Sequence, residues 1–407
     1  MEVLGCDGWS VEHRVCCVLS HSSRILHNAQ ESNADGSWAT LPNRVNKKQF
    51  DSMNSGYYTE IVTRAYPITH FCFDIYPTMQ PVLEVRDLST WYHTPRGPVK
   101  AVDGVSFSLY PGQRFGLIGE SGSGKSTIAL SLLRLIRPPG RIEGGQVLLD
   151  GIDLLSLSDE EMRQKRLAEM ALISQGAMNS LNPVIRVRKQ MEDGFRNHDL
   201  ELSQEERDQR IAALLARVGL PASVADLYPH QLSGGMKQRV CIAIAISLHP
   251  KVIIADDPTS ALDVVVQRRV MQTLRRVQED IGSAVILIGH DMGLMAQFAG
   301  HVGVMYAGKL VEEGPVRQIF SQPQHPYTQL LMESLPNLES RTMSRGVTGQ
   351  PPSLLSPPPG CVFHPRCPYV MERCQVDVPQ LQQTAPQHRA ACHLLDVKQD
   401  VREEIAA

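Results

Sequence analysis

The sequence feature that most constrains the fold is the glycine-rich segment Gly119–Ser126, whose residues follow the pattern G-x-x-x-x-G-K-S. A short apolar run precedes it and the helical pattern IALSLLRLI follows it, which is the strand–loop–helix context of a phosphate-binding loop. Its glycines let successive backbone N–H groups approach phosphate oxygens, Lys125 supplies a positive charge, and the Ser126 hydroxyl can ligate Mg²⁺. The segment therefore predicts an α/β fold with a nucleotide site at this loop.

The rest of the α/β pattern starts abruptly at Val82. Short apolar runs alternate with longer amphipathic patterns, and continuous apolar runs are typical of strands buried on both faces. Strands are predicted at Val82–Val85, Val105–Leu109, Phe115–Ile118, Ala171–Ile173, Val252–Ala255 and Ala284–Ile288. Strand patterns are missing between Ser180 and Tyr228, where Gln204–Val218 has helical spacing, so a helical insertion in the core is predicted.

Two further segments strengthen the prediction of a nucleotide site. Asp256 ends the apolar run KVIIAD, where its carboxylate could hold Mg²⁺, although an aspartate at a strand end is by itself commonly a cap. The segment LSGGMKQR, Leu232–Arg239, places Ser233 and free N–H groups at a predicted helix start. Taken alone, LSGGMKQR is equally consistent with a phosphate-binding segment and with a simple Gly-Gly turn before a helix.

In order and spacing these segments resemble the ATP-binding cassette (ABC) family over about residues 82–335. The resemblance implies a P-loop NTPase with a RecA-like core, a β subdomain and an inserted helical subdomain, which binds and hydrolyses ATP with Mg²⁺. The nucleotide-binding positions that it implies are Tyr92, Gly119, Glu120, Ser121, Gly122, Ser123, Gly124, Lys125, Ser126, Thr127 and Gln175.

The same resemblance assigns roles to individual residues. Ser126, Gln175 and Asp256 are implied as Mg²⁺ ligands, and Asp257, His290 and Lys125 as the catalytic residues. LSGGMKQR matches the family signature, so the residues implied to serve ATP bound by another subunit are Ser233, Gly234 and Gly235. Asp263 belongs to a D-loop, in the segment TSALD.

Asp257 departs from the family pattern, because relatives usually have Glu immediately after the aspartate that ends the strand. That glutamate positions or deprotonates the attacking water, and Asp is shorter by one methylene. A misplacement of about 1 Å can lower a rate on the order of 100-fold. We therefore predict that this chain binds ATP but that its own hydrolytic site is slowed.

The chain of 407 residues is expected to divide into three parts. Residues 1–78 are polar and aperiodic in large part, and are interpreted as a disordered leader or a misassigned start, with a small independent domain as the alternative. Residues 79–335 form the nucleotide-binding domain, with a helical subdomain at about 176–245. Residues 336–407 contain a Pro-rich linker, GQPPSLLSPPPG, and form a C-terminal extension.

That extension carries four of the nine cysteines, Cys361, Cys367, Cys374 and Cys392. Their separations of six, seven and eighteen positions do not match a C-x-x-C zinc ribbon. The tail resembles the extension of the oligopeptide/dipeptide permease ATPases, which implies a [4Fe–4S] cluster. Two alternatives remain: a zinc site that uses His364, His388 or His393, and free buried thiols.

Charge and hydropathy restrict the partners. A net charge of −3 gives no reason to expect nucleic acid, and the N-terminus lacks the basic start and apolar run of a secretory signal. Without a run of about 18–20 apolar residues, membrane association has to come through a partner.

The leading function is the ATPase subunit of an importer for di- or oligopeptides, peripheral on the cytoplasmic face of the cell membrane. Its expected partners are a second ATPase subunit, two membrane permeases and a substrate-binding protein. The alternatives are a regulatory ATP-binding subunit and an ABC ATPase that does not act in transport.

Overall fold

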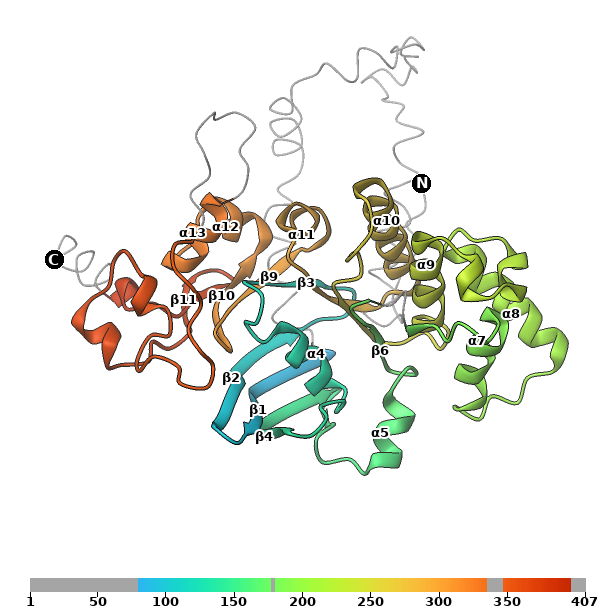
Figure 1. Ribbon diagram of the computed structural model, residues 1–407, viewed down its shortest axis with the longest axis horizontal. Helices are drawn as coiled ribbons and strands as arrows, with labels where there is room; N and C mark the ends of the chain where they lie inside the picture. Colours follow the sequence, from blue (N-terminus) through green and yellow to red (C-terminus); the bar gives the residue numbers. More distant parts are fainter. Residues whose placement is uncertain (1–79, 177–179, 335–346, 397–407) are drawn as a thin grey trace, which may run out of the picture. The chain divides into compact units, whose positions relative to one another are not determined.

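Two β-sheets form the framework of the chain in the computed structural model, which describes residues 80–176, 180–334 and 347–396 (Figure 1). These residues belong to one unit, Met79–Ala407. The expected leader, residues 1–78, lies outside the described residues.

The larger sheet has eight strands within the described residues, in the order β11-β12-β10-β9-β3-β8-β7-β6. Five neighbouring strands, β9, β3, β8, β7 and β6, are parallel, and the others join antiparallel. The bounds are β3 Arg114–Ile118, β6 Met170–Ile173, β7 Val252–Asp256, β8 Ala284–Ile288, β9 His301–Tyr306, β10 Lys309–Pro315, β11 Gln382–Ala385 and β12 His388–Ala390.

The smaller sheet is antiparallel, in the order β2-β1-β4-β5. Helix α4, Lys125–Leu132, follows the glycine-rich loop and contacts β1 and β2 of this sheet as well as β7 of the larger one. Apolar side chains from both sheets and α4 form one buried cluster around it. The strands are β1 Leu83–Thr94, β2 Gly97–Leu109, β4 Gly140–Leu149 and β5 Ile152–Asp153.

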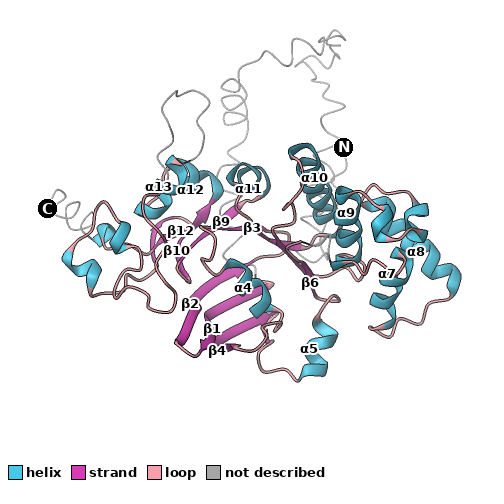
Figure 2. Cartoon of the chain, in the orientation of Figure 1, coloured by secondary structure: helices cyan, strands magenta, loops and turns pink. Residues whose placement is uncertain are grey.

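The remaining helices lie beyond the sheets. In Figure 2, α10, α11 and α12 lie on the side of the larger sheet away from α4, and α7, α8 and α9 gather beside β6. The bounds are α5 Asp159–Lys165, α7 Val187–Arg196, α8 Gln204–Arg217, α9 Gly234–Ala245, α10 Val264–Ile281, α11 Met292–Phe298, α12 Val316–Ser321 and α13 Pro326–Glu333. Short 3₁₀ turns are η3 Ala222–Asp226, η4 Pro229–Gln231, η5 His364–Arg366 and η6 Glu372–Gln375. No helix in these ranges is both long and apolar enough to cross a bilayer.

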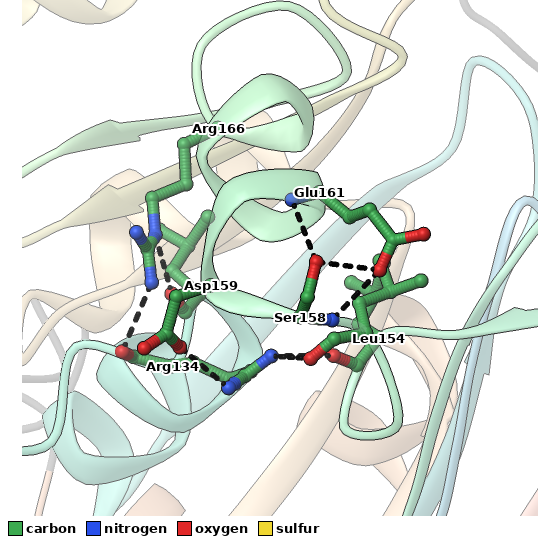
Figure 3. Close-up of polar contacts among 8 residues, drawn as sticks. Arg134, Leu154, Ser158, Asp159, Glu161 and Arg166 are labelled. Carbon is green, nitrogen blue, oxygen red and sulfur yellow. Dashed lines mark hydrogen bonds and ion pairs between the residues drawn. The ribbon is translucent and has the colours of Figure 1, made fainter.

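Polar contacts fix the end of α4 to α5, as Figure 3 shows. Arg134 donates to the carboxylate of Asp159 at 2.9 Å and to the Leu154 carbonyl at 3.5 Å, and Arg166 donates to the Arg134 carbonyl at 3.2 Å. Ser158 starts α5 with a capping box, in which its hydroxyl accepts from the Glu161 N–H and Glu161 accepts from the Ser158 N–H. The helix that carries the phosphate-binding loop is therefore anchored at its far end.

The expected α/β class, β subdomain and helical insertion are confirmed. All six predicted strands are present, and the helix predicted at Gln204–Val218 is α8, which ends one residue earlier at Arg217. Its apolar positions, Ile211, Leu214 and Leu215, are buried against the other helices of the insertion. Strands β4, β5, β9, β10, β11 and β12 were not predicted.

Candidate nucleotide site

The loop between β3 and α4 can be built only from glycine at two positions. Gly119 has φ +145°, and a Cβ added to it would lie 2.1 Å from the Met305 carbonyl oxygen. Gly124 has φ +102°, and its Cβ would lie 2.0 Å from the Ala101 carbonyl oxygen. Any side chain would collide with backbone at both points, so the loop's shape follows from its sequence.

Lys125 begins α4 and folds back over the loop. Its Nζ donates to the carbonyl oxygens of Gly119 at 2.9 Å and Glu120 at 2.8 Å, and to the Ser123 hydroxyl at 3.1 Å. Burial lowers the pKa of Lys125 to about 8, against the opposing effect of three nearby carboxylates. The ammonium group is thereby held within the loop, at the wall of the cavity described below.

Ser126 and Asp256 form the next part of the site. The Ser126 hydroxyl donates to Asp256 Oδ1 at 3.0 Å, and Asp256 ends the fully buried strand β7. Burial raises the pKa of Asp256, and the Ser126 hydrogen bond opposes that rise. The hydroxyl, this carboxylate and the amide of Gln175 line one cavity, and oxygen donors of this kind suit Mg²⁺.

Asp257 and His290 contact each other across the ends of two strands. Asp257 Oδ2 lies 3.1 Å from His290 Nδ1, and the Asp257 N–H donates to the Ile288 carbonyl at 2.8 Å. Asp257 has φ +45°, in the left-handed region, which Asp and Asn adopt more readily than other side chains. His290 is mostly exposed, with 74% of its side chain accessible, and Asp257 is 14% accessible.

An open cavity of about 460 Å³ joins these parts. It brings together most of the residues that the sequence predicts for nucleotide, Mg²⁺ and catalysis. Its lining residues are Gly119, Ser121, Gly122, Ser123, Gly124, Lys125, Ser126, Thr127, Gln175, Asp256, Asp257, Ser260, Ile288, Gly289 and His290.

Tyr92 and Glu120, the two other predicted nucleotide contacts, do not line this cavity. Tyr92 lies on β1 opposite Gly140 of β4, and its ring fills the space that a Cβ at Gly140 would occupy. The adenine contact of Tyr92 stays a prediction.

Ser233 of the signature and Asp263 of the D-loop segment start helices and do not line the cavity. Ser233 caps α9 by accepting from the Met236 N–H at 3.4 Å, and Asp263 caps α10 by accepting from the Val266 N–H at 3.0 Å. A Cβ at Gly235 would lie 2.5 Å from Val266 Cγ1, so the signature helix packs directly on the helix that follows the D-loop. The trans role of these residues stays a prediction.

Sequence reasoning missed two contacts to the phosphate-binding loop. The Tyr327 hydroxyl of α13 accepts from the Glu120 N–H at 2.9 Å. Arg366 of η5 donates to both carboxylate oxygens of Glu120, at 2.7 and 3.0 Å. Neither residue lies in a motif or a periodic pattern that links it to the loop, so only the fold reveals them.

The four cysteines of the extension are free, and they interact with one another electrostatically. Burial raises the pKa of Cys361 and Cys367, and it raises that of Cys392 to about 12, with the other three thiols adding to the shift at Cys392. Yet the described residues contain no group of three or more His, Cys, Asp or Glu side chains that could hold a metal ion. The expected iron–sulfur site is therefore not confirmed.

The histidines of the zinc alternative have other partners. His388 Nε2 lies 2.7 Å from Glu312 Oε1, in a fully buried pair. The Nδ1 of His364 contacts the Cys361 carbonyl, and Nε2 of His393 contacts the Asp377 carbonyl, both at 3.0 Å.

Fold and site together define a P-loop nucleotide-hydrolysing domain, and comparisons with known proteins agree. The family model "ABC transporter" matches residues 102–260, and the model "Oligopeptide/dipeptide transporter, C-terminal region" matches residues 311–374. The dipeptide transport ATP-binding protein DppD of Haemophilus influenzae is 42% identical over 315 residues, covering 77% of this chain and 95% of that protein. The oligopeptide transport ATP-binding protein AppF of Bacillus subtilis is 39% identical over 326 residues, covering 77% and 98%.

A solved structure agrees with the fold. The dimeric, post-hydrolysis structure of the ATP-binding cassette MJ0796 with ADP and Pi has a TM-score of 0.52 and 28% identity, covering 58% of this chain and 99% of that one. The chain belongs to the ABC transporter family, in the branch of oligopeptide/dipeptide transporter ATP-binding proteins. It is an ATPase whose hydrolysis is coupled to transport, and membership implies membrane permeases and a second ATPase domain as partners.

Proposed function

We propose that this chain energises the import of di- or oligopeptides from the cytoplasmic face of the cell membrane. One observation carries the peptide cargo: residues 311–374 match the C-terminal region of oligopeptide/dipeptide transporters. The proposed partners are a related but different ATPase chain, two membrane permeases and an extracytoplasmic substrate-binding protein. Nickel or a sugar as cargo is the competing outcome.

In the proposed reaction, water attacks the γ-phosphate of ATP held in the 460 Å³ cavity. Lys125 and the loop N–H groups bind phosphate oxygens, and Tyr92 stacks on adenine. Ser126, Gln175 and Asp256 would hold Mg²⁺, which when bound would offset negative charge on the phosphates. Asp257 orients the water.

Two further roles belong to the same proposal. His290 contacts the γ-phosphate, a position that its exposed side chain beside Asp257 supports. The signature residues of this chain, which are Ser233, Gly234 and Gly235, contact ATP held by the partner subunit when the two subunits close. Asp263 of the D-loop lies at the same interface in this proposal. Closure of the two subunits would then switch the permeases between their inward-facing and outward-facing states.

Reconstitution tests the function. The chain is co-purified with its permeases, placed in lipid vesicles and assayed for ATP hydrolysis with a dipeptide, a nickel salt or a sugar added with the binding protein. We expect the dipeptide to stimulate hydrolysis and Lys125→Ala to abolish this chain's contribution. Stimulation by nickel or sugar alone would reject the peptide cargo, and an absence of co-purifying permeases would reject transport.

We also propose a [4Fe–4S] cluster held by Cys361, Cys367, Cys374 and Cys392. Support comes from the chemistry of the ligand set: four free cysteines lie within 32 residues of the extension, and four Cys thiolates are the usual ligands of such a cluster. Iron and acid-labile sulfide are measured in anaerobically purified protein, and about four of each per chain are expected. One equivalent of zinc without sulfide would reject the cluster.

A further inference from the structure

Glu120 has a carboxylate that the nucleotide site does not use. It is the second residue of the phosphate-binding loop, yet it does not line the cavity. Both of its carboxylate oxygens accept hydrogen bonds from Arg366, in a parallel two-bond geometry that is among the strongest side-chain pairings. The Arg366 side chain is only 6% exposed and that of Glu120 is 23% exposed.

Arg366 is held rigidly in that position by the extension. Its Nε donates to the Thr348 carbonyl at 2.8 Å and its Nη2 donates to the Val347 carbonyl at 3.1 Å. Its Nη1 also donates to the Tyr306 hydroxyl at 3.1 Å. Every nitrogen of the guanidinium therefore has a partner, so Arg366 cannot swing away without breaking several hydrogen bonds.

An aromatic cluster packs beside the contact between Arg366 and Glu120 and stabilises it. Tyr306 at the end of β9, Tyr327 of α13 and Phe363 pack with ring centroids 4.5 to 5.4 Å apart. Tyr327 and Phe363 are fully buried, and the Tyr327 hydroxyl accepts the N–H of Glu120. Glu120 is thus bound at its carboxylate by the extension, at its N–H by α13, and at its carbonyl by Lys125.

The charges explain why this arrangement matters for ATP. An unpaired carboxylate in the loop would repel the phosphates and would compete with them for Lys125. At short range and at the effective dielectric of a protein surface, such repulsion weakens binding by about tenfold or more. Arg366 neutralises Glu120 without entering the cavity.

We infer that Arg366 is a positioning residue of the nucleotide site, by which the C-terminal extension neutralises Glu120 and fixes the phosphate-binding loop in its ATP-binding form. This inference rests on the proposed ATP site and goes beyond it, since it makes ATP affinity depend on the extension. The extension is then part of the nucleotide site and not only an addition to it.

The test is a double-variant cycle on the full chain, read out as the equilibrium affinity for Mg²⁺-ATP. Arg366→Gln should raise the Kd about tenfold, because it leaves the Glu120 charge unpaired. Adding Glu120→Gln to it should restore the Kd to within about threefold of the wild-type value, because the unpaired charge is gone. A role of Arg366 in packing alone would not be rescued in this way.

Arg389→Gln is the matched control. Like Arg366, Arg389 is an arginine of the extension that pairs with a glutamate of the core, the buried Glu313 on β10. Neither Arg389 nor Glu313 lines the nucleotide cavity. It should leave the Kd unchanged. The thermal unfolding midpoint of each variant is measured in parallel.

Several outcomes would overturn the inference. They are an unchanged Kd in Arg366→Gln, a double variant as weak as the single one, and an Arg389→Gln variant that loses ATP equally. If Arg366→Gln does not fold, Glu120→Gln alone decides: it should bind ATP at least as tightly as wild type, and a tenfold loss rejects the inference. Failure of the wild-type chain to bind ATP would instead reject the proposed function.

Discussion

Replacing Asp257 by glutamate should accelerate ATP hydrolysis at this chain's own site. The carboxylate of Asp257 contacts His290 at 3.1 Å and lies just past the end of β7, next to Asp256, the proposed Mg²⁺ ligand. Glutamate extends the side chain by one carbon–carbon bond, about 1.5 Å. Because a misplacement of about 1 Å can change a rate on the order of 100-fold, we expect a 10- to 100-fold gain.

A small loss of stability should accompany that gain. Asp257 has φ +45°, and an aspartate tolerates this left-handed backbone better than a glutamate does. We expect Asp257→Glu to lower the free energy of unfolding by about 1 kcal/mol. Faster hydrolysis together with a slightly lower unfolding midpoint would be the combined signature of the substitution.

The assay is single-turnover hydrolysis in the assembled complex, with the partner's site silenced at its own phosphate-binding loop. Only ATP bound by this chain then reacts. Asp256→Asn serves as the control, since it removes a proposed Mg²⁺ ligand and should abolish turnover with either residue at 257. An unchanged rate in Asp257→Glu would refute the idea that the shorter carboxylate slows this site.

Three other outcomes are expected. Ser233→Arg should impair transport more than Asp257→Ala does, because we propose that the signature serves ATP in the other subunit; the opposite ranking, in a vesicle uptake assay, would reject the trans role. Gly119→Ala should destabilise the fold by about 3 kcal/mol and abolish ATP binding, since its Cβ would meet a carbonyl oxygen at 2.1 Å, whereas Gly122→Ala, with open space around it, should cost about 1 kcal/mol in thermal unfolding. Burial lowers the pKa of His325 to about 4, below its ordinary 6.5, so the unfolded chain binds the extra proton and stability is lost as pH falls from about 6.5 towards 4. Between pH 8 and pH 5 the free energy of unfolding, measured by chemical denaturation, should therefore fall by about 2 kcal/mol more in wild type than in His325→Gln. Parallel pH profiles of the two proteins would contradict this.

The parts of the fold that follow from local pattern were predictable. The strands β3, β7 and β8 are continuous apolar runs because both faces of the parallel sheet are covered. The segment from Gly119 to Ser126 gave the position of the loop, because its shape depends on its own glycines. Most of the cavity lining could therefore be read from motifs.

Strand β10 could not be predicted, for a physical reason. It contains two consecutive buried glutamates, Glu312 and Glu313, which a strand pattern disfavours. The nearest of their polar partners are about 12 positions away, His301 beside Glu313 and the Gln324 N–H at Glu312. Others lie much farther along the chain: His388 beside Glu312, and Arg389 with Glu313. A strand whose buried charges are paired by residues about 76 positions away leaves no local signal.

The contact between Arg366 and Glu120 was also unpredictable, because the two residues are far apart in the sequence. Arg366 lies 246 positions from Glu120, between two cysteines that indicate metal binding and give no sign of a contact with the loop. Hydrogen bonds to the Tyr306 hydroxyl at the end of β9 and to the Thr348 and Val347 carbonyls hold the arginine at the loop.

The pairing of β12 with β10 limits how far the C-terminal extension can be removed or transferred to another protein. Because β10 and β12 share hydrogen bonds at Glu312↔Ala390 and Glu313↔Arg389, the tail completes the sheet that carries the catalytic strands. A shortened chain would leave this edge of β10 unpaired, and Glu312 and Glu313 would lose His388 and Arg389 as partners, which is costly for buried carboxylates. The tail is therefore not an exchangeable module: grafting it onto another cassette requires a recipient whose β10 carries the same two glutamates in the same register.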